Sequence, residues 1–209
     1  MLLKNDPEAV DLIYLLNISF MEGGEVNVIA ISKIKPEHWQ ESRPTAEKLI
    51  AATRNEEGNL RYDWYRDANE EGTGVALERF KSMEAFQAHA TSEHIKEAGG
   101  KFKDWSSAPT VVRVLKPENV SADSKCGDES SFNVVVIIQI KPESFEAAKP
   151  ETEKLIEATR KENGILRYDW YQDIKEAGVI VILECYTNEE AFKSHCETEE
   201  LKAFLAKSK

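Results

Sequence analysis

The first part of the chain has the pattern of a strand followed by an amphipathic helix. Residues 26–34 are rich in β-branched side chains and end at Lys35-Pro36, which predicts a strand. Residues 44–56 carry apolar side chains at helical spacing, so they predict a helix. Gly58 is the expected end of that helix, because glycine readily adopts the left-handed conformation that terminates many helices.

Two further strands are predicted after this helix. Residues 60–65 alternate along the strand, so Tyr62 and Trp64 share one face and Asp63 lies on the other. A polar turn follows, and the apolar run at 75–80 predicts the next strand.

A second helix and a fourth strand complete the unit. Ser82 is a typical N-cap, and the spacing after it places His89 on the apolar face of a helix. Gly99 and Gly100 are expected to end this helix, and residues 109–115 predict a strand. The order βαββαβ is that of a ferredoxin-like unit.

The same pattern recurs 106 positions later. Residues 60–65 reappear unchanged at 166–171, and roughly half of the residues from 27 to 103 match their counterparts, far more than chance allows. A repeat of this length is a domain rather than a solenoid unit. The sequence therefore predicts an α+β protein of two tandem ferredoxin-like units.

The repeat also predicts the domain organisation. An N-terminal extension at 1–24, expected to be helical from about residue 7 to 16, precedes a first unit at 25–116. A polar linker at 117–131, expected to be solvent-exposed, leads to a second unit at 132–209. The second unit stops after its second helix without a fourth strand of its own, and the N-terminal extension is a candidate to cap its sheet.

Charge and composition narrow the classes of function. The net charge of -11 disfavours a nucleic-acid partner or an anionic membrane surface, because both require clustered Lys and Arg. With 41% hydrophobic and 31% charged residues, the composition is that of a globular protein.

The cysteines and the N-terminal region point to a cytoplasmic protein. The three cysteines are odd in number and show no CxxC spacing, so they indicate neither a disulfide framework nor a zinc site. The apolar stretch at 12–20 is too short to span a bilayer, and the acidic residues before it are unlike a signal peptide.

Motifs in both copies resemble the antibiotic biosynthesis monooxygenase (ABM) family. In the first copy, residues 56–63 (EEGNLRYD) look like the turn by which the family passes from its first helix into a Leu-Arg-Tyr strand. The remaining matches are Glu78-Arg79-Phe80, Glu84-Ala85-Phe86, His89 and Ser92-Glu93-His94, the last without the family's proline. The second copy repeats them at Glu184-Cys185-Tyr186, Glu190-Ala191-Phe192 and His195, with Glu200 in place of the second histidine.

The resemblance implies a fold and a chemistry. Members of the family usually pair two sheets face to face as a dimeric α+β barrel, so the tandem copies would form a pseudo-dimer within one chain. A sheet with helices on one side also leaves its other face in need of cover. The family's enzymes oxidise small aromatic or quinol-like substrates with O2 and without flavin, haem or metal. We therefore expect a small aromatic substrate and O2 as partners, no cofactor and no metal site. Association of two such chains into a further homodimer is compatible with this pseudo-dimer.

Chemistry of this kind needs a base near neutral pH. His89 and His195 are the candidates, because the reference pKa of imidazole is close to the working pH. Glu78 and Glu184 lie within strands and could orient these histidines. The competing interpretation is a core histidine bonded to a strand or to one of these carboxylates.

Aromatic residues on the second strand of each copy could line a substrate pocket: Tyr62, Trp64, Tyr168 and Trp170. They could equally be ordinary sheet core. Asp63 and Asp169 would face the opposite side, where Asp63 is expected to pair with Arg61 of a neighbouring strand.

Three functions stay open at this point. They are a cofactor-independent monooxygenase, a cofactor-free isomerase or proton-transfer enzyme on a small carbonyl compound, and a non-catalytic ligand-binding or stress-related protein. Haem degradation is disfavoured. Haem-degrading relatives have an asparagine on the first strand, where this chain has Ile31 and Ser32, and a proximal histidine on the second helix, at a position that falls near Gly99 in this chain. Motifs for nucleotide or zinc chemistry are absent from the sequence.

Overall fold

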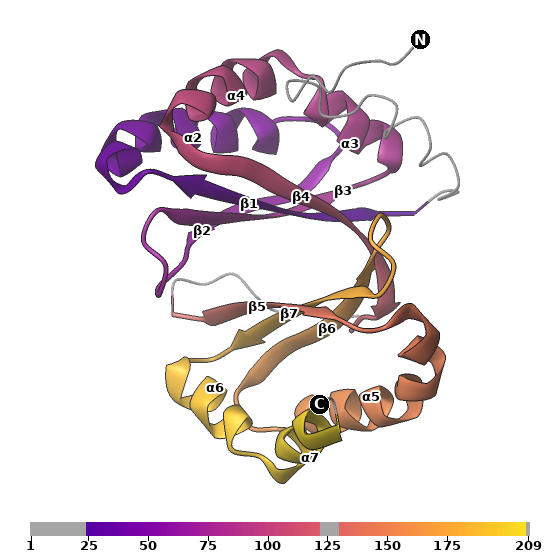
Figure 1. The fold of residues 1–209 in the computed structure, drawn as a ribbon. Coiled ribbons are helices and arrows are strands. Elements are labelled where there is room, and N and C mark those ends of the chain that lie inside the picture. The colour runs from indigo at the N-terminus through magenta and orange to yellow at the C-terminus, as the bar shows by residue number, and fades with distance from the viewer. Residues whose placement is uncertain (1–23, 122–129, 208–209) are drawn as a thin grey trace. The chain divides into compact units, whose positions relative to one another are not determined.

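The computed structural model describes residues 24–121 and 130–207, which divide into two compact units at Val114/Leu115. Each unit is α+β, with the elements of one ferredoxin-like copy (Figure 1). The predicted fold class is therefore confirmed. The N-terminal extension, which the sequence predicts to be helical, lies outside the described residues.

Unit 1 has a four-stranded antiparallel sheet in the order β2-β3-β1-β4. Its strands are β1 (Val26–Ile34), β2 (Asn59–Arg66), β3 (Thr73–Phe80) and the first part of β4 (Ser106–Asn119). Because β3 lies between β1 and β2, its Glu78 is opposite both Val28 and Tyr62. The helices α2 (Trp39–Arg54), α3 (Met83–Ala90) and α4 (Glu93–Trp105) cover one face of this sheet (Figure 1).

Unit 2 repeats three of these strands and the three helices. It contains β5 (Phe132–Gln139), α5 (Phe145–Thr159), β6 (Ile165–Asp173), β7 (Val179–Tyr186), α6 (Glu189–Cys196) and α7 (Glu199–Lys207). A short 3-10 turn precedes the first helix in each unit, at Pro36–His38 and Pro142–Ser144. The strand β7 lies between β6 and β5, and all of its residues are buried.

The fourth strand of unit 2 comes from β4. This strand continues to Asn119, so it includes the first residues of the segment expected to be a linker, and its end pairs with β6 from Leu115 to Asn119. In unit 1, β4 lies beside β1; in unit 2 it lies beside β6, at the sheet edge opposite the one that the repeat would predict. Pro117 is tolerated there, because this strand lies at the edge of unit 2's own sheet.

The first helix begins earlier than the sequence predicts. The apolar spacing places its start at Pro44, but α2 starts at Trp39 and Pro44 lies inside it. Proline has no N–H to donate to the carbonyl of Gln40, yet its fixed φ suits a helix near its N-terminus. Pro150 lies inside α5 in the same way.

The prediction that one helix runs from Ser82 to Gly99 and Gly100 is wrong. The helix α3 ends at Ala90, and α4 begins after Ser92, whose side chain accepts a hydrogen bond from the N–H of Ile95. Both glycines lie within α4, where each costs up to about 1 kcal/mol relative to alanine. The Ser92 cap therefore places His94 in the first turn of a new helix.

The glycine after the first helix serves close packing as well as the turn. Gly164 has a φ of +88°, whereas Gly58 has no positive φ. A Cβ on Gly58 would lie 2.4 Å from the Cβ of Ala85, and one on Gly164 would lie 2.6 Å from that of Ala191. Both units therefore require glycine at this position, because the turn lies close against the second helix.

Candidate functional site

His89 lies between the helices and the sheet of unit 1. The N-cap hydrogen bond from Ala85 N–H to Ser82 Oγ fixes the start of α3, and His89 follows in its last turn. Its side chain is 4% exposed, and its ring lies 5.0 Å from that of Phe80 and 5.7 Å from that of Tyr62. His89 is therefore on the buried face of its helix, as its spacing predicts, and the structure places it beside Tyr62.

Two carboxylates flank the imidazole of His89. Its Nδ1 lies 3.0 Å from Glu56 Oε1, which is a hydrogen bond. Its Nε2 lies 3.8 Å from Glu78 Oε2, which is close enough for an ion pair but too long for a hydrogen bond. The sequence suggests Glu78 as the partner, and the structure adds Glu56 as the nearer one.

Glu56 also binds a second histidine. Its Oε1 lies 2.6 Å from Nε2 of His94, so the carboxylate bridges His89 and His94. Glu56 belongs to the turn after α2, and the same turn carries Glu162 in unit 2. The recurrence of this glutamate in both copies could have marked Glu56 as a candidate site residue. Its contact with His89 could not be predicted, because the two residues are far apart in the sequence.

Burial sets the protonation of this cluster. It raises the pKa of Glu78 to about 8, with the charge of Glu56 as the second cause. Burial also lowers the pKa of His89, and the hydrogen bond and charge of Glu56 oppose that shift. At neutral pH Glu78 is therefore a protonated acid and His89 a neutral imidazole, which is able to accept a proton.

Unit 2 has a related but different cluster. His195 Nδ1 lies 3.0 Å from Glu162 Oε2, as in unit 1. Glu184, the counterpart of Glu78, accepts a 2.7 Å hydrogen bond from the hydroxyl of Tyr186. Glu200 stands in the sequence where unit 1 has His94.

The aromatic residues considered for a pocket divide into two groups. Tyr62 and Tyr168 are buried against the two histidines, with ring distances of 5.7 Å to His89 and 5.6 Å to His195. Burial is the main cause that raises the pKa of both tyrosines, so each stays a neutral phenol.

The two tryptophans pack against other aromatic residues. Trp64 stacks on Trp39 at 5.3 Å. At the corresponding place in unit 2, Trp170 and the smaller Phe145 line a cavity of about 40 Å³. Phe145 stands where unit 1 has the larger Trp39, and the cavity beside it is too small for a polyketide-sized aromatic.

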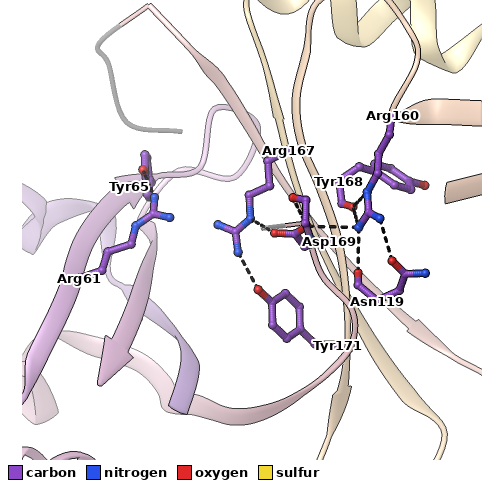
Figure 2. A network of polar contacts seen from close by, with 9 residues as sticks. Arg61, Tyr65, Asn119, Arg160, Arg167, Tyr168, Asp169 and Tyr171 are labelled. Carbon is purple, nitrogen blue, oxygen red and sulfur yellow. Dashed lines mark hydrogen bonds and ion pairs between the residues drawn. The ribbon is translucent and has the colours of Figure 1, made fainter. Parts of the chain in front are cut away.

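A separate polar network lies on the second strand. Asp169 accepts a hydrogen bond from Arg167 Nε at 2.8 Å, and Arg167 also donates to the hydroxyl of Tyr171 at 3.0 Å (Figure 2). Arg160 contacts the same carboxylate at 3.5 Å. Asp63 makes the corresponding contacts with Arg61 and Arg54 in unit 1. The expected pairing of Asp63 with Arg61 is therefore observed, although Arg61 lies on the same strand as Asp63 and not on a neighbouring one.

Comparison with known families agrees with the duplicated fold. The model of the antibiotic biosynthesis monooxygenase family, ABM, matches residues 26–101 and again 131–207. The chain therefore belongs to the ABM family and carries two copies of its domain.

Individual relatives support the assignment. The Bacillus subtilis (strain 168) protein named "Putative monooxygenase YcnE" is 38% identical over 83 residues, which are 40% of this chain and 87% of that protein. A crystal structure named as a putative monooxygenase from Fusobacterium nucleatum superposes with a TM-score of 0.75 at 16% identity and covers 90% of this chain and 87% of its own. An anthrone oxidase-like protein superposes with a TM-score of 0.68 at 10% identity over 88% and 85% of the two chains. At such identities the two structures bear on the fold alone.

Within residues 24–121 and 130–207, no helix is long and apolar enough to cross a membrane.

Proposed function

We propose that unit 1 is the active site of a cofactor-independent monooxygenase that oxidises a small quinol or polyketide-like aromatic with O2. The observation that carries the proposal is the convergence of His89, Glu56 and Glu78 beside the buried Tyr62, in a domain of the ABM family.

The proposed reaction needs no external reductant. For an aromatic methylene compound of the anthrone type, the methylene carbon loses both hydrogens and gains one oxygen atom as a carbonyl. The second oxygen atom of O2 leaves with those two hydrogens as water, and the substrate supplies all four electrons. Loss of a proton first converts the substrate into an electron-rich anion, which can react with O2. The task of the protein is then to remove that proton, to stabilise the anion and to keep water out.

The residues of unit 1 divide these tasks. Neutral His89 is the proposed base, oriented by its hydrogen bond to Glu56. Glu78 is the proposed hydrogen-bond donor to the oxyanion, because a buried carboxylic acid can donate to a developing negative charge. Tyr62 supplies an aromatic wall next to the imidazole.

Access to the site is expected on the side of Glu56 and His94. Their side chains are 19% and 23% exposed, whereas that of His89 is 4% exposed. A substrate would therefore enter past the Glu56–His94 pair and place its acidic carbon against His89 Nε2, the nitrogen that faces Glu78.

The same groups would also serve a cofactor-free isomerase, since both reactions begin with removal of a proton. Oxygen uptake by the metal-stripped protein separates the two, because only the oxygenase consumes O2. Substitution of His89 should lower that uptake by about 10²–10⁴-fold, the usual contribution of a positioned base.

A further inference from the structure

We propose that Glu56, His89 and His94 form a binding site for a divalent transition-metal ion of the Zn²⁺ type in unit 1. The three side chains come from three different elements: the turn after α2, the end of α3 and the first turn of α4. The inference does not depend on the proposed oxygenase.

The ligand set suits such an ion. Two imidazoles and one carboxylate are common ligands of zinc, and a set of three leaves a fourth position for water. Hard ions such as Mg²⁺ and Ca²⁺ prefer oxygen ligands alone, so the two histidines disfavour them.

The distances are close to those of a filled site. One ligand atom from each side chain lies within 4.8 Å of the other two. Glu56 Oε1 is 2.6 Å from His94 Nε2 and 3.0 Å from His89 Nδ1. Tetrahedral zinc with bonds of about 2.0–2.2 Å holds its ligand atoms roughly 3.3 Å apart. An ion can therefore replace the hydrogen-bonding protons if Glu56 Oε1 moves away from His94 Nε2 by about 0.7 Å and from His89 Nδ1 by about 0.3 Å.

The surroundings hold the first ligand in place. Bound through Nδ1, His89 would direct its Nε2–H towards Glu78 Oε2, which lies 3.8 Å away. A carboxyl group behind a ligating histidine is the usual arrangement in zinc sites, where it orients the ring. The partly exposed Glu56 and His94 leave a path for the ion from solvent.

Unit 2 is a natural comparison within the same chain. It keeps the Glu162–His195 hydrogen bond at 3.0 Å, but Glu200 replaces the second histidine. Unit 2 therefore keeps the counterparts of two ligands, but its described residues bring no third ligand atom to them, so we expect it to bind such an ion more weakly.

Occupancy would have a consequence for unit 1. An ion on His89 Nδ1 would break the hydrogen bond to Glu56 and block the approach to the imidazole. Zn²⁺ would then act as an inhibitor of the proposed proton removal.

The test is calorimetric titration of the metal-stripped, full-length protein with Zn²⁺ under reducing conditions, with Co²⁺ absorption as a second readout. The expected result is one site per chain and a Co²⁺ spectrum without thiolate charge-transfer bands. His94→Ala should weaken binding by at least about tenfold, since even loss of outer-shell partners costs 10–100-fold. His38→Ala, which removes the exposed His38–Glu41 pair, should leave it unchanged.

A variant that gains a site controls for the case in which His94→Ala loses binding because it misfolds. Glu200→His places a histidine at the position that corresponds to His94 and should raise the stoichiometry from one to two. Absence of Zn²⁺ binding in the wild type, or binding that His94→Ala leaves intact, would overturn the proposal. Oxygen uptake by the metal-free protein is a separate measurement, so failure of one proposal leaves the other standing.

Discussion

The hydroxyl of Tyr186 donates a 2.7 Å hydrogen bond to Glu184 inside unit 2. The two residues are buried on β7 and lie two positions apart, so they share one face of the strand. Burial raises the pKa of Glu184, and the hydrogen bond from Tyr186 opposes that shift. Unit 1 has Phe80 at the equivalent position, which offers no hydroxyl to Glu78.

The substitution Tyr186→Phe should therefore make stability more sensitive to pH. A carboxyl whose folded-state pKa is raised keeps its proton after the unfolded chain has lost it. Stability then falls as the pH rises from the unfolded-state value of about 4.5 through the folded-state value, by up to roughly 1.4 kcal/mol per pH unit. Tyr186→Phe raises the folded-state pKa further and extends this fall to higher pH.

Urea denaturation between pH 4 and 8 measures the effect. Glu184→Gln is the control, because Tyr186→Phe in that background should leave the slope of stability against pH unchanged. An unchanged slope after Tyr186→Phe in the wild-type background would contradict the assigned hydrogen bond.

Loss of the buried Arg167–Asp169 ion pair of unit 2 should destabilise the protein more than loss of the Arg61–Asp63 pair of unit 1. The side chain of Asp169 is 1% exposed and also accepts hydrogen bonds from the N–H and hydroxyl of Ser121, both at 2.8 Å. Asp169→Asn leaves the charge of the buried Arg167 without compensation and should cost about 3–5 kcal/mol. Asp63→Asn, at a side chain that is 30% exposed, should cost about 1 kcal/mol or less. Equal losses in urea denaturation would show that burial does not set the difference.

The sequence predicted the repeat because residues recur 106 positions later, and it predicted the strands and the placement of His89 because those depend on local periodicity. It did not predict the break between α3 and α4, because the glycine pair at 99 and 100 indicates a helix end and the N-cap at Ser92 lies inside the predicted helix. The Glu56–His89 contact was missed for another reason: it joins a turn to a helix 33 positions away, and spacing along the chain carries no information about such a pair.

The pairing of β4 with β6 was not predicted for a similar reason. The repeat implies a fourth strand beside β5, and only the three-dimensional structure shows that the end of β4 lies beside β6. The pocket role of Tyr62, Trp64, Tyr168 and Trp170 stays a prediction.

The two glycines that the structure distinguishes should respond in opposite ways to alanine. Gly58→Ala brings a new Cβ within 2.4 Å of Ala85 Cβ and should cost about 1–3 kcal/mol through overpacking. Gly99→Ala meets nothing within 4 Å inside α4 and should stabilise the protein by about 0.5–1 kcal/mol. Thermal unfolding followed by circular dichroism measures both. A neutral Gly58→Ala would mean that the turn and α3 can move apart without cost.

The pairing of the two copies within one chain is a further prediction. In each unit the helices cover one face of the sheet, which leaves the other face to be buried by a partner (Figure 1). A shortened chain ending at residue 121 should therefore self-associate or lose solubility, whereas the full chain should not need a second copy for this purpose. Size-exclusion chromatography with light scattering distinguishes these cases. A soluble and strictly monomeric single copy would contradict the proposed pseudo-dimer.

Oxygen uptake tests the central claim most directly. Metal-stripped wild-type protein is compared with His89→Ala and His195→Ala, using a panel of quinols and hydroxyanthrones, after circular dichroism confirms that the variants are folded. The proposal predicts uptake that survives metal removal, falls by about 10²–10⁴-fold in His89→Ala and changes little in His195→Ala. Absence of uptake with every substrate, or equal rates in His89→Ala and wild type, would contradict the assignment of unit 1 as an oxygenase site with His89 as its base.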